Sequence, residues 1–273
     1  MLRRLRAWLL DPDVAAAADV DSVEHAVANR RVLERKVVAR KLFERFYRQC
    51  RGLDLRCFGS ARGPRVEMGS GSSRIKDVFP DVITSDYLQL PWVDVVLSAQ
   101  QMPFADGSLR AIYGINLFHH LADPRRFLRE AVRVLDAGGG VVLIEPYHGP
   151  FARFMFQRLH ASEGFDPGVR AWESTDANGP MSNANQALSY VVFLRDRETF
   201  LREFPELELI GDYPHTHVWY LASGGVNFRQ LVPDSFTGAL GLVERLLSPL
   251  DRWIALQHTI VLRKRLGEVH ERA

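Results

Sequence analysis

Hydrophobic positions recur with two different spacings along this chain, and the spacing changes near residue 65. Before that point, the run from Val32 to Tyr47 contains no glycine or proline, and its apolar residues return at the spacing of one helix face. Arginines and lysines fill the positions between them, as on a solvated face. This part of the pattern predicts a helical N-terminal extension over residues 1–62.

After residue 65, short apolar runs alternate with helical ones, which is typical of a parallel sheet covered by helices. Strands are expected at residues 65–68, 81–86, 93–98, 111–116, 141–145, 207–212 and 259–263. Helices are expected at residues 72–78, between the cap Asp123 and the glycines of 138–140, and at residues 199–204. The prediction is an α/β fold with a mostly parallel, seven-stranded sheet and helices on both faces.

Two stretches are too long to be simple connections between these elements. Residues 146–195 are rich in glycine, asparagine, proline and aromatic side chains, and we expect a lid region there. Residues 218–257 form a predicted helical insertion with an apolar stripe at Leu240, Val243, Leu246, Leu247, Leu250, Trp253 and Ile254. We place both inside one domain spanning residues 63–273.

The apolar stripe and the basic, apolar segment of residues 1–10 have two interpretations. They make a weak contact with a membrane surface, or they pack within the protein or across a homodimer. The expected location of the protein depends on the same choice, and it is either the cytoplasm or the periphery of the membrane.

Composition narrows the class of protein without naming a function. The chain has 273 residues, of which 47% are hydrophobic and 25% charged, and this is ordinary for a globular protein. The net charge of +2 argues neither for nor against nucleic acid, but the lack of a basic stripe predicts no nucleic-acid partner. Cys50 and Cys57 fit no disulfide framework and no metal-ligand spacing, so we expect a reducing cytoplasm and no metal site.

One motif carries most of the chemical information. Residues 66–73, Val-Glu-Met-Gly-Ser-Gly-Ser-Ser, place an acidic residue at the end of a strand and a glycine-rich turn directly after it. Glycines let the backbone turn tightly and approach a ligand, and a following helix would present free N–H groups. This arrangement is how a nucleotide-like cofactor is usually held at the edge of a parallel sheet.

Four further motifs follow the glycine turn in a recognisable order. They are Met-Pro-Phe-Ala-Asp-Gly-Ser at 102–108, Leu-Phe-His-His-Leu at 117–121, Arg-Val-Leu at 133–135 and Gly-Gly-Gly at 138–140. Together, over about residues 64–146, they resemble the class I S-adenosylmethionine-dependent methyltransferases that act on small molecules. The resemblance implies a Rossmann-like core and S-adenosyl-L-methionine as the cofactor.

The resemblance also implies roles for individual residues. Glu67, Gly69, Ser70 and Gly71 would contact the methionine part of the cofactor, with the carboxylate orienting the amino group. Asp86 ends the second strand, where a carboxylate accepts hydrogen bonds from both ribose hydroxyls. The remaining expected cofactor residues are Ala99 and Gln100 at the adenine and Asn116 beside the sulfonium.

This sequence departs from the family pattern at three points. Ser73 replaces the third glycine, Ser98 replaces an acid near the adenine, and the connection from Asp86 to Val93 is too short for the usual helix. These departures keep open an alternative, a non-catalytic methyltransferase-like partner subunit. A nicotinamide dehydrogenase is disfavoured because the final glycine of the dinucleotide fingerprint is missing.

Methyl transfer requires alignment of the acceptor with the sulfonium, and a hydroxyl acceptor also needs a general base. The candidate bases are His148, His119 and His120, which follow strands at the carboxyl edge of the sheet. The lid holds many aromatic residues, and Ser182, Asn183 and Asn185 add hydrogen-bonding groups. We therefore expect a small-molecule or glycan-type acceptor, methylated at a hydroxyl oxygen.

Overall fold

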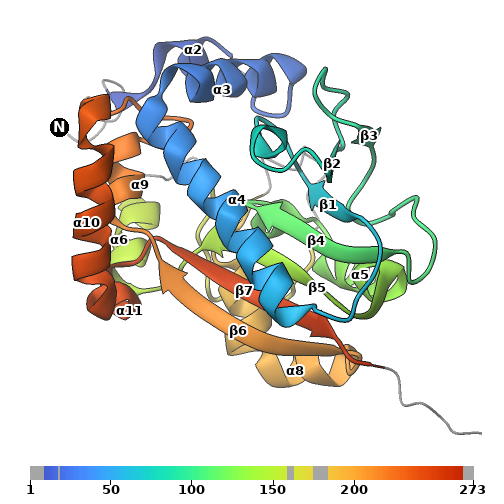
Figure 1. Ribbon diagram of the computed structural model, residues 1–273. Helices are drawn as coiled ribbons and strands as arrows, with labels where there is room; N and C mark the ends of the chain where they lie inside the picture. Colours follow the sequence, from blue (N-terminus) through green and yellow to red (C-terminus); the bar gives the residue numbers. More distant parts are fainter. Residues whose placement is uncertain (1–8, 18, 159–162, 175–183, 267–273) are drawn as a thin grey trace, which may run out of the picture.

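A seven-stranded sheet forms the centre of the molecule (Figure 1). The computed structural model describes residues 9–17, 19–158, 163–174 and 184–266. The strands are β1 (Arg65–Met68), β2 (Val82–Asp86), β3 (Val95–Val96), β4 (Leu109–Ile115), β5 (Leu135–Pro146), β6 (Leu207–His215) and β7 (Gln257–Lys264). Their order is β3-β2-β1-β4-β5-β7-β6, with β7 antiparallel to both of its neighbours and the other pairs parallel. The predicted α/β class and the mostly parallel sheet are confirmed.

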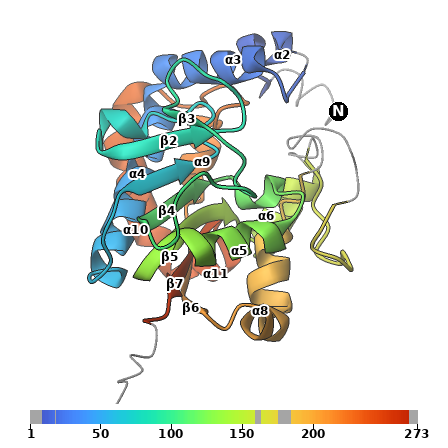
Figure 2. The same cartoon turned by 90° about the vertical axis from the view of Figure 1, so that its right-hand side faces the viewer.

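Helices cover both faces of this sheet (Figures 1 and 2). One face packs against α4 (Val37–Cys57), α9 (Val218–Ser223) and α10 (Thr237–Leu247). The other packs against α5 (Pro124–Val134), α8 (Arg197–Glu203) and the π-helical turn η3 (Val191–Arg195). The strands are buried on both faces, and their alternating side chains supply two cores, one on each side of the sheet.

The N-terminal segment contains α2 (Pro12–Ala16), α3 (Val23–Arg35) and α4. Although the sequence analysis placed residues 1–62 outside the domain, α4 buries Val38, Leu42 and Phe46 directly in the core of the sheet. The boundary at residue 62 stays a prediction, and residues 1–8 lie outside the described part of the chain.

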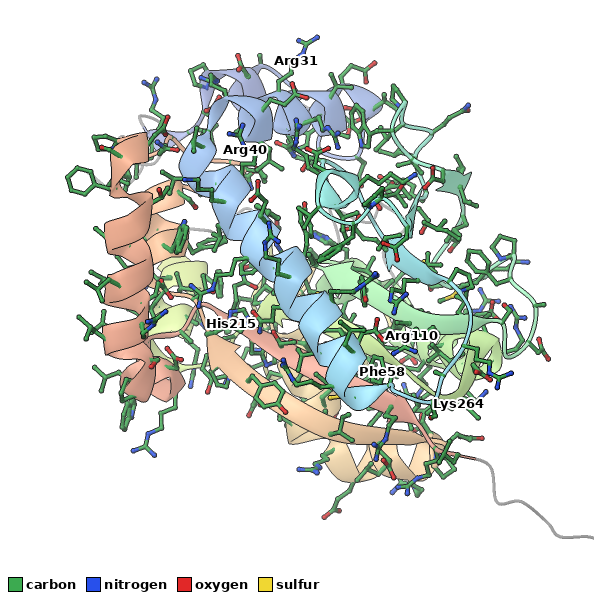
Figure 3. All side chains as sticks on the ribbon, in the orientation of Figure 1. Arg31, Arg40, Phe58, Arg110, His215 and Lys264 are labelled. Carbon is green, nitrogen blue, oxygen red and sulfur yellow. The ribbon has the colours of Figure 1, made fainter. Side chains whose placement is uncertain are left out.

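The carboxylate of Asp54 fastens α4 to the sheet. Asp54 is fully buried, and its two oxygens accept hydrogen bonds from Arg65 Nε at 2.5 Å, Arg110 Nε at 2.6 Å and the Tyr113 hydroxyl at 2.9 Å. Arg65 begins β1, and Arg110 and Tyr113 belong to β4. Figure 3 marks Arg110 beside the C-terminal part of α4. A buried charge is tolerated here because three donors from two strands surround it.

Two expectations about single elements are wrong. Gly138, Gly139 and Gly140 do not end α5 but lie inside β5, which begins directly after that helix. A Cβ on Gly140 would stand 2.2 Å from the Leu262 carbonyl oxygen and 2.3 Å from the Phe58 ring. Glycine is needed there because Phe58, which directly follows α4, packs against the strand.

The helix expected at residues 72–78 is also wrong, since only one 3-10 turn, η1 (Ile75–Asp77), follows the glycine loop. The backbone N–H groups of Gly71 and Arg74 instead donate to the Asp86 carboxylate and the Tyr47 hydroxyl. Side chains from β2 and α4 thus satisfy donors that a longer helix would have left free.

The 146–195 region contains α6 (Pro150–Arg158) and α7 (Leu188–Tyr190) among its described residues. A buried chain of hydrogen bonds ties α7 to the sheet: Ser189 Oγ lies 2.8 Å from His258 Nε2, and His258 Nδ1 lies 2.8 Å from Asp212 Oδ1. Ser189 and His258 have no exposed area. The three residues therefore connect α7 to β7 and β6, and the serine hydroxyl is not accessible to a substrate.

The helical insertion predicted at 218–257 consists of α9, η4 (Asp234–Phe236), α10, η5 (Ser248–Leu250) and α11 (Asp251–Ile254). Its apolar stripe divides, because Leu240 is buried whereas Leu246 and Trp253 are exposed by 68% and 43%. The membrane contact and the homodimer stay predictions. Of the helices described, none combines the length and the apolar character needed to cross a bilayer.

We expect Asp54→Ala to lower the free energy of unfolding by about 3–5 kcal/mol, because it leaves two partly buried guanidinium groups without their partner. Asp81→Ala is the matched control, since Asp81 pairs with Arg51 and Arg65 but is half exposed, and about 0–1 kcal/mol is expected. Urea unfolding followed by circular dichroism measures both. Equal losses for the two variants would contradict the anchoring role of Asp54.

Candidate functional site

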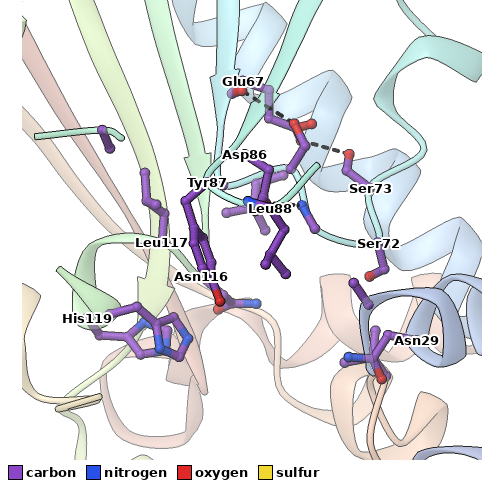
Figure 4. Close-up of a pocket in the computed structure, with 18 of the residues that line it drawn as sticks. Asn29, Glu67, Ser72, Ser73, Asp86, Tyr87, Leu88, Asn116, Leu117 and His119 are labelled. Atoms are coloured by element: carbon purple, nitrogen blue, oxygen red, sulfur yellow. Dashed lines mark hydrogen bonds between the residues drawn. The ribbon is translucent and has the colours of Figure 1, made fainter. Parts of the chain in front are cut away.

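A cavity of about 540 Å³ opens at the carboxyl ends of β1, β2, β4 and β5, where the strand order changes direction (Figure 4). This volume lies within the range of small-molecule and cofactor sites. The cavity is lined by ten of the predicted site residues: Glu67, Gly69, Ser70, Gly71, Asp86, Ala99, Gln100, Asn116, His119 and His120. The structure therefore brings the glycine turn and the Leu-Phe-His-His-Leu motif into one site.

The glycine turn has the backbone conformation for which only glycine is well suited. Gly69 and Gly71 have φ angles of +63° and +44°, and a Cβ on Gly69 would lie 2.7 Å from Leu117 Cδ1. The turn is held in place by Asp86, whose Oδ2 accepts the Gly71 N–H at 2.7 Å. The loop and the end of β2 thus form one rigid wall of the cavity.

Asp86 is buried at the end of β2 with both oxygens engaged by backbone donors. Its Oδ1 accepts the Leu88 N–H at 2.9 Å, opposite the bond to Gly71. Burial raises the pKa of Asp86, and the backbone donors oppose that shift. Each carboxylate oxygen can accept more than one hydrogen bond, so Asp86 can also receive hydroxyl donors from a ligand.

Glu67 is nearly completely buried at the end of β1, and one of its oxygens lacks a donor. Oε1 accepts a hydrogen bond from Ser73 Oγ at 2.8 Å, whereas the buried Oε2 has no partner among the described residues. Burial raises the pKa of Glu67 to about 7. A cationic group in the cavity would supply the missing partner and stabilise the carboxylate.

Ser73, which departs from the family glycine, has a role in this arrangement. Its hydroxyl donates to Glu67 and lies 3.1 Å from the Tyr47 hydroxyl, which also accepts the Arg74 N–H. The serine therefore links α4 to the carboxylate at the end of β1.

The other predicted cofactor residues lie on the opposite wall. Asn116 follows β4 with a φ of +52°, a conformation that asparagine tolerates, and its N–H donates to the Ile144 carbonyl at 2.8 Å. Gln100 Oε1 accepts the Asp123 N–H at 3.0 Å, so part of its side chain secures the start of α5. Ala99 and Ser98 complete this wall.

His119 is held between two carboxylates. Its Nδ1 lies 2.6 Å from Glu145 Oε2, and its Nε2 lies 3.5 Å from Glu163 Oε2. Burial opposes a charge on His119, but the two carboxylates outweigh burial and raise its pKa to about 9. A histidine that already holds a proton at neutral pH is poorly suited to act as a general base.

Glu145 also shapes the backbone at this point. Its Oε1 accepts the N–H groups of Leu117 at 2.8 Å and Phe118 at 2.7 Å, which begin the 3-10 turn η2 (Phe118–His120). The carboxylate at the end of β5 thus positions both histidines of the Leu-Phe-His-His-Leu motif.

His148 is not among the residues that line the cavity. Its ring stacks on Tyr190 with centroids 3.6 Å apart, and burial lowers its pKa to about 4. This geometry gives no support to His148 as the general base, and of the three candidates only His120 is both at the cavity and partly exposed.

The sequence analysis missed a contribution from the N-terminal helices. His25, Ala26 and Asn29 of α3 line the cavity, and Figure 4 shows Asn29 with the residues of the strand ends. Arg30 fixes α3 there by donating to the Ser73 carbonyl and lying 4.8 Å from the Trp92 ring centroid. No local signal identifies these residues, because their role depends on where α3 comes to lie.

Five further lining residues come from distant parts of the chain: Phe156, Glu163, Gln186, Tyr220 and Gln257. They belong to the predicted lid region, to α9 and to the start of β7. Phe156, Glu163 and Gln186 fall within the predicted lid region. Ser182 and Asn183 of that region lie outside the described residues.

Comparison with known families gives the same assignment as the fold and the site. A family model described as a methyltransferase domain matches residues 73–143, from the end of the glycine turn into β5. The sheet around that stretch has the strand order of a Rossmann-like methyltransferase, with an antiparallel β7. Residues 73–143 thus match a methyltransferase domain, and they lie within a Rossmann-like sheet.

Solved structures of similar architecture are distant in sequence. Geranyl diphosphate C-methyltransferase from Streptomyces coelicolor A3(2), in a complex that includes S-adenosyl-L-homocysteine, is 17% identical, with a TM-score of 0.45 over 94% of this chain and 89% of its own. The YcgJ protein from Bacillus subtilis is 16% identical, with a TM-score of 0.42 over 79% of this chain and 98% of its own.

The residues of the cavity fit the cofactor that the family implies. The orphaned Glu67 Oε2 suits the α-amino group of S-adenosylmethionine, and Asp86 suits the two ribose hydroxyls. The glycine turn leaves room for the ligand backbone between these two carboxylates. When bound, the cofactor supplies an activated methyl group on a sulfonium.

The pKa of Glu67 predicts that cofactor affinity depends on pH. An ammonium group binds the ionised carboxylate, so S-adenosylhomocysteine should bind about tenfold more weakly at pH 5.5 than at pH 7.5, as Glu67 gains its proton below about 7. Glu67→Gln should bind more weakly at pH 7.5 and lose most of this dependence. Calorimetric titration of both proteins at the two pH values measures the affinity. An unchanged pH dependence in Glu67→Gln would exclude Glu67 as the group whose protonation weakens binding.

Proposed function

We propose that this protein is a methyltransferase that transfers the methyl group of S-adenosylmethionine to a hydroxyl oxygen of a small-molecule or glycan-type acceptor. The observation that carries the proposal is the cavity in which the unpaired oxygen of Glu67 and the carboxylate of Asp86 face the same space. Two buried carboxylates on a glycine turn match a ligand with one ammonium group and two vicinal hydroxyls.

The chain's main contribution is to hold the cofactor in one orientation. Glu67 would hold the amino group and Asp86 the ribose, with Asn116 on the side of the sulfonium. Pre-positioning of this kind supplies much of the acceleration in a displacement reaction, because the entropy of alignment is lost on binding.

The acceptor would enter from the side bounded by Phe156, Tyr220 and Gln257. Gln257 is almost fully buried, and its Oε1 has no hydrogen-bond partner among the described residues. A carbonyl-type oxygen in this position accepts a hydrogen bond from a hydroxyl group, which supports an acceptor that carries one. The aromatic rings supply an apolar surface for the rest of the molecule.

The hydroxyl proton must leave when the new bond forms. His120 and Glu163 border this end of the cavity, whereas His119 is already paired with Glu145. We assign proton removal to the His120 and Glu163 end of the site, with His119 as a positioning residue.

A non-catalytic partner subunit is the alternative that Ser73 and Ser98 left open. Ser73 gives it no support, because its hydroxyl orders the Glu67 carboxylate and does not occupy the cofactor space. Ser98 and its neighbour Ala99 both line the cavity, so the adenine end also keeps its opening. We therefore favour the enzyme.

Asp86→Ala should weaken S-adenosylhomocysteine binding by about 1–3 kcal/mol, because it removes the acceptor for the ribose hydroxyls and leaves the Gly71 N–H unpaired. Asp106→Ala is the control, since Asp106 is 80% exposed and pairs with Arg133 away from the cavity. Calorimetry measures the affinities, and wild-type affinity in Asp86→Ala would remove Asp86 from the cofactor site.

The acceptor is tested by incubating the protein with S-adenosylmethionine and a panel of hydroxylated aromatics, polyketides and glycosides. Release of S-adenosylhomocysteine with a hydroxylated member, and none after its hydroxyl is blocked, is the expected result. Tight cofactor binding with no transfer to any member would contradict the hydroxyl acceptor and favour the partner subunit.

A further inference from the structure

His119, His120 and Glu163 meet at one end of the cavity. One ligating atom from each of the three lies within 4.8 Å of the other two, and all three residues line the cavity. Two histidines and one carboxylate form a donor set that binds divalent transition metals, including zinc in catalytic sites with an open position.

The separation of two of these atoms already matches a coordinated pair. Tetrahedral angles and metal–ligand bonds of roughly 2.0–2.2 Å place neighbouring ligand atoms about 3.3–3.6 Å apart. His119 Nε2 and Glu163 Oε2 are 3.5 Å apart. The ring centroids of His119 and His120 are 4.0 Å apart, and a ring nitrogen of the partly exposed His120 lies within 4.8 Å of the ligand atoms of the other two residues.

Glu145 supplies the support that metal-binding histidines usually have. Its carboxylate lies 2.6 Å from His119 Nδ1, which therefore keeps a proton, so an ion that displaces the proton on Nε2 would meet the Nε2 lone pair on the side of Glu163. A carboxylate behind a ligating histidine fixes its tautomer and orientation and strengthens the bond to the metal.

The backbone holds the two sides of the cluster together. The Asn185 N–H donates to the His119 carbonyl at 2.9 Å, and Asn185 forms a bridge with Gly164, the neighbour of Glu163. Gln186 Nε2 donates to the Glu163 carbonyl at 3.3 Å. Residues more than forty positions apart are thus held in register at the cavity wall.

We propose that His119, His120 and Glu163 bind a divalent transition-metal ion, with an open coordination position directed into the cavity. The sequence analysis expected no metal site, because two adjacent histidines and a distant glutamate form no ligand motif. The ion would take the place between Glu163 and the histidines that a proton occupies in their ion pair.

The use of this ion rests on the proposed function. Placed beside the acceptor, the ion would bind the acceptor oxygen and lower the pKa of its hydroxyl. With His120 and Glu163 bound to the ion, the hydroxyl proton would leave to water instead of to these two residues. The new O–C bond would form as the sulfonium C–S bond breaks, and S-adenosylhomocysteine would leave. Acceptors with two neighbouring oxygens would bind best, because both can reach one ion.

The test is calorimetric titration of chelator-treated, full-length protein with zinc chloride, and with cobalt(II) chloride followed by visible absorption. One zinc per chain at micromolar affinity and tetrahedral cobalt bands are expected. His120→Ala and Glu163→Gln should each weaken zinc binding by more than about 100-fold, since even outer partners of a metal site contribute about 10- to 100-fold. His148 does not line the cavity, so the control variant His148→Ala should bind zinc as the wild type does.

S-adenosylhomocysteine titration of the same samples separates this proposal from the proposed function. No zinc binding below the millimolar range, or undiminished binding in both ligand variants, overturns the metal site even when the cofactor binds normally. Zinc binding without cofactor binding would instead contradict the proposed function and leave the metal site in place.

Discussion

Three buried carboxylates at the carboxyl edge of the sheet determine the shape of the functional site. Asp86, Glu67 and Glu145 end β2, β1 and β5, and each is at least 95% buried. A buried carboxylate is stable only when donors surround it, so each one orders the chain next to it. Asp86 holds the glycine turn, and Glu145 holds the turn that carries both histidines. Glu67 alone keeps an oxygen without a donor, and this difference marks where a cationic ligand belongs.

The same constraint explains why the loops need so little secondary structure. The Gly71 and Arg74 N–H groups donate to side chains of β2 and α4, and the glycine loop is therefore fixed without the helix that usually follows it. Similarly, the short connection after Asp86 contains no helix among its described residues, as the sequence predicted. The site depends on side chains at strand ends more than on helix N-termini.

Local patterns predicted the parts of the fold whose signals lie within a few residues. The apolar runs located all seven strands, and the Asp-Pro pair located the start of α5, where Asp123 caps the helix. The glycines of 138–140 were misassigned because a helix stop and a close approach of Phe58 require the same residue type. Long-range proximity had no local signal: Asn29, Glu163 and Gln257 reach the cavity only because the sheet brings their segments together. For the same reason, the sequence could not separate His148 from His120.

The central claim is that the carboxylates of Glu67 and Asp86 form a site for S-adenosylmethionine. Calorimetric titration of the wild-type protein with S-adenosylmethionine and S-adenosylhomocysteine, and with NADH as a control, tests it most directly. Micromolar binding of the first two, at one site per chain and without NADH binding, is the predicted result. A folded protein that binds neither, or that binds NADH in their place, would contradict the claim.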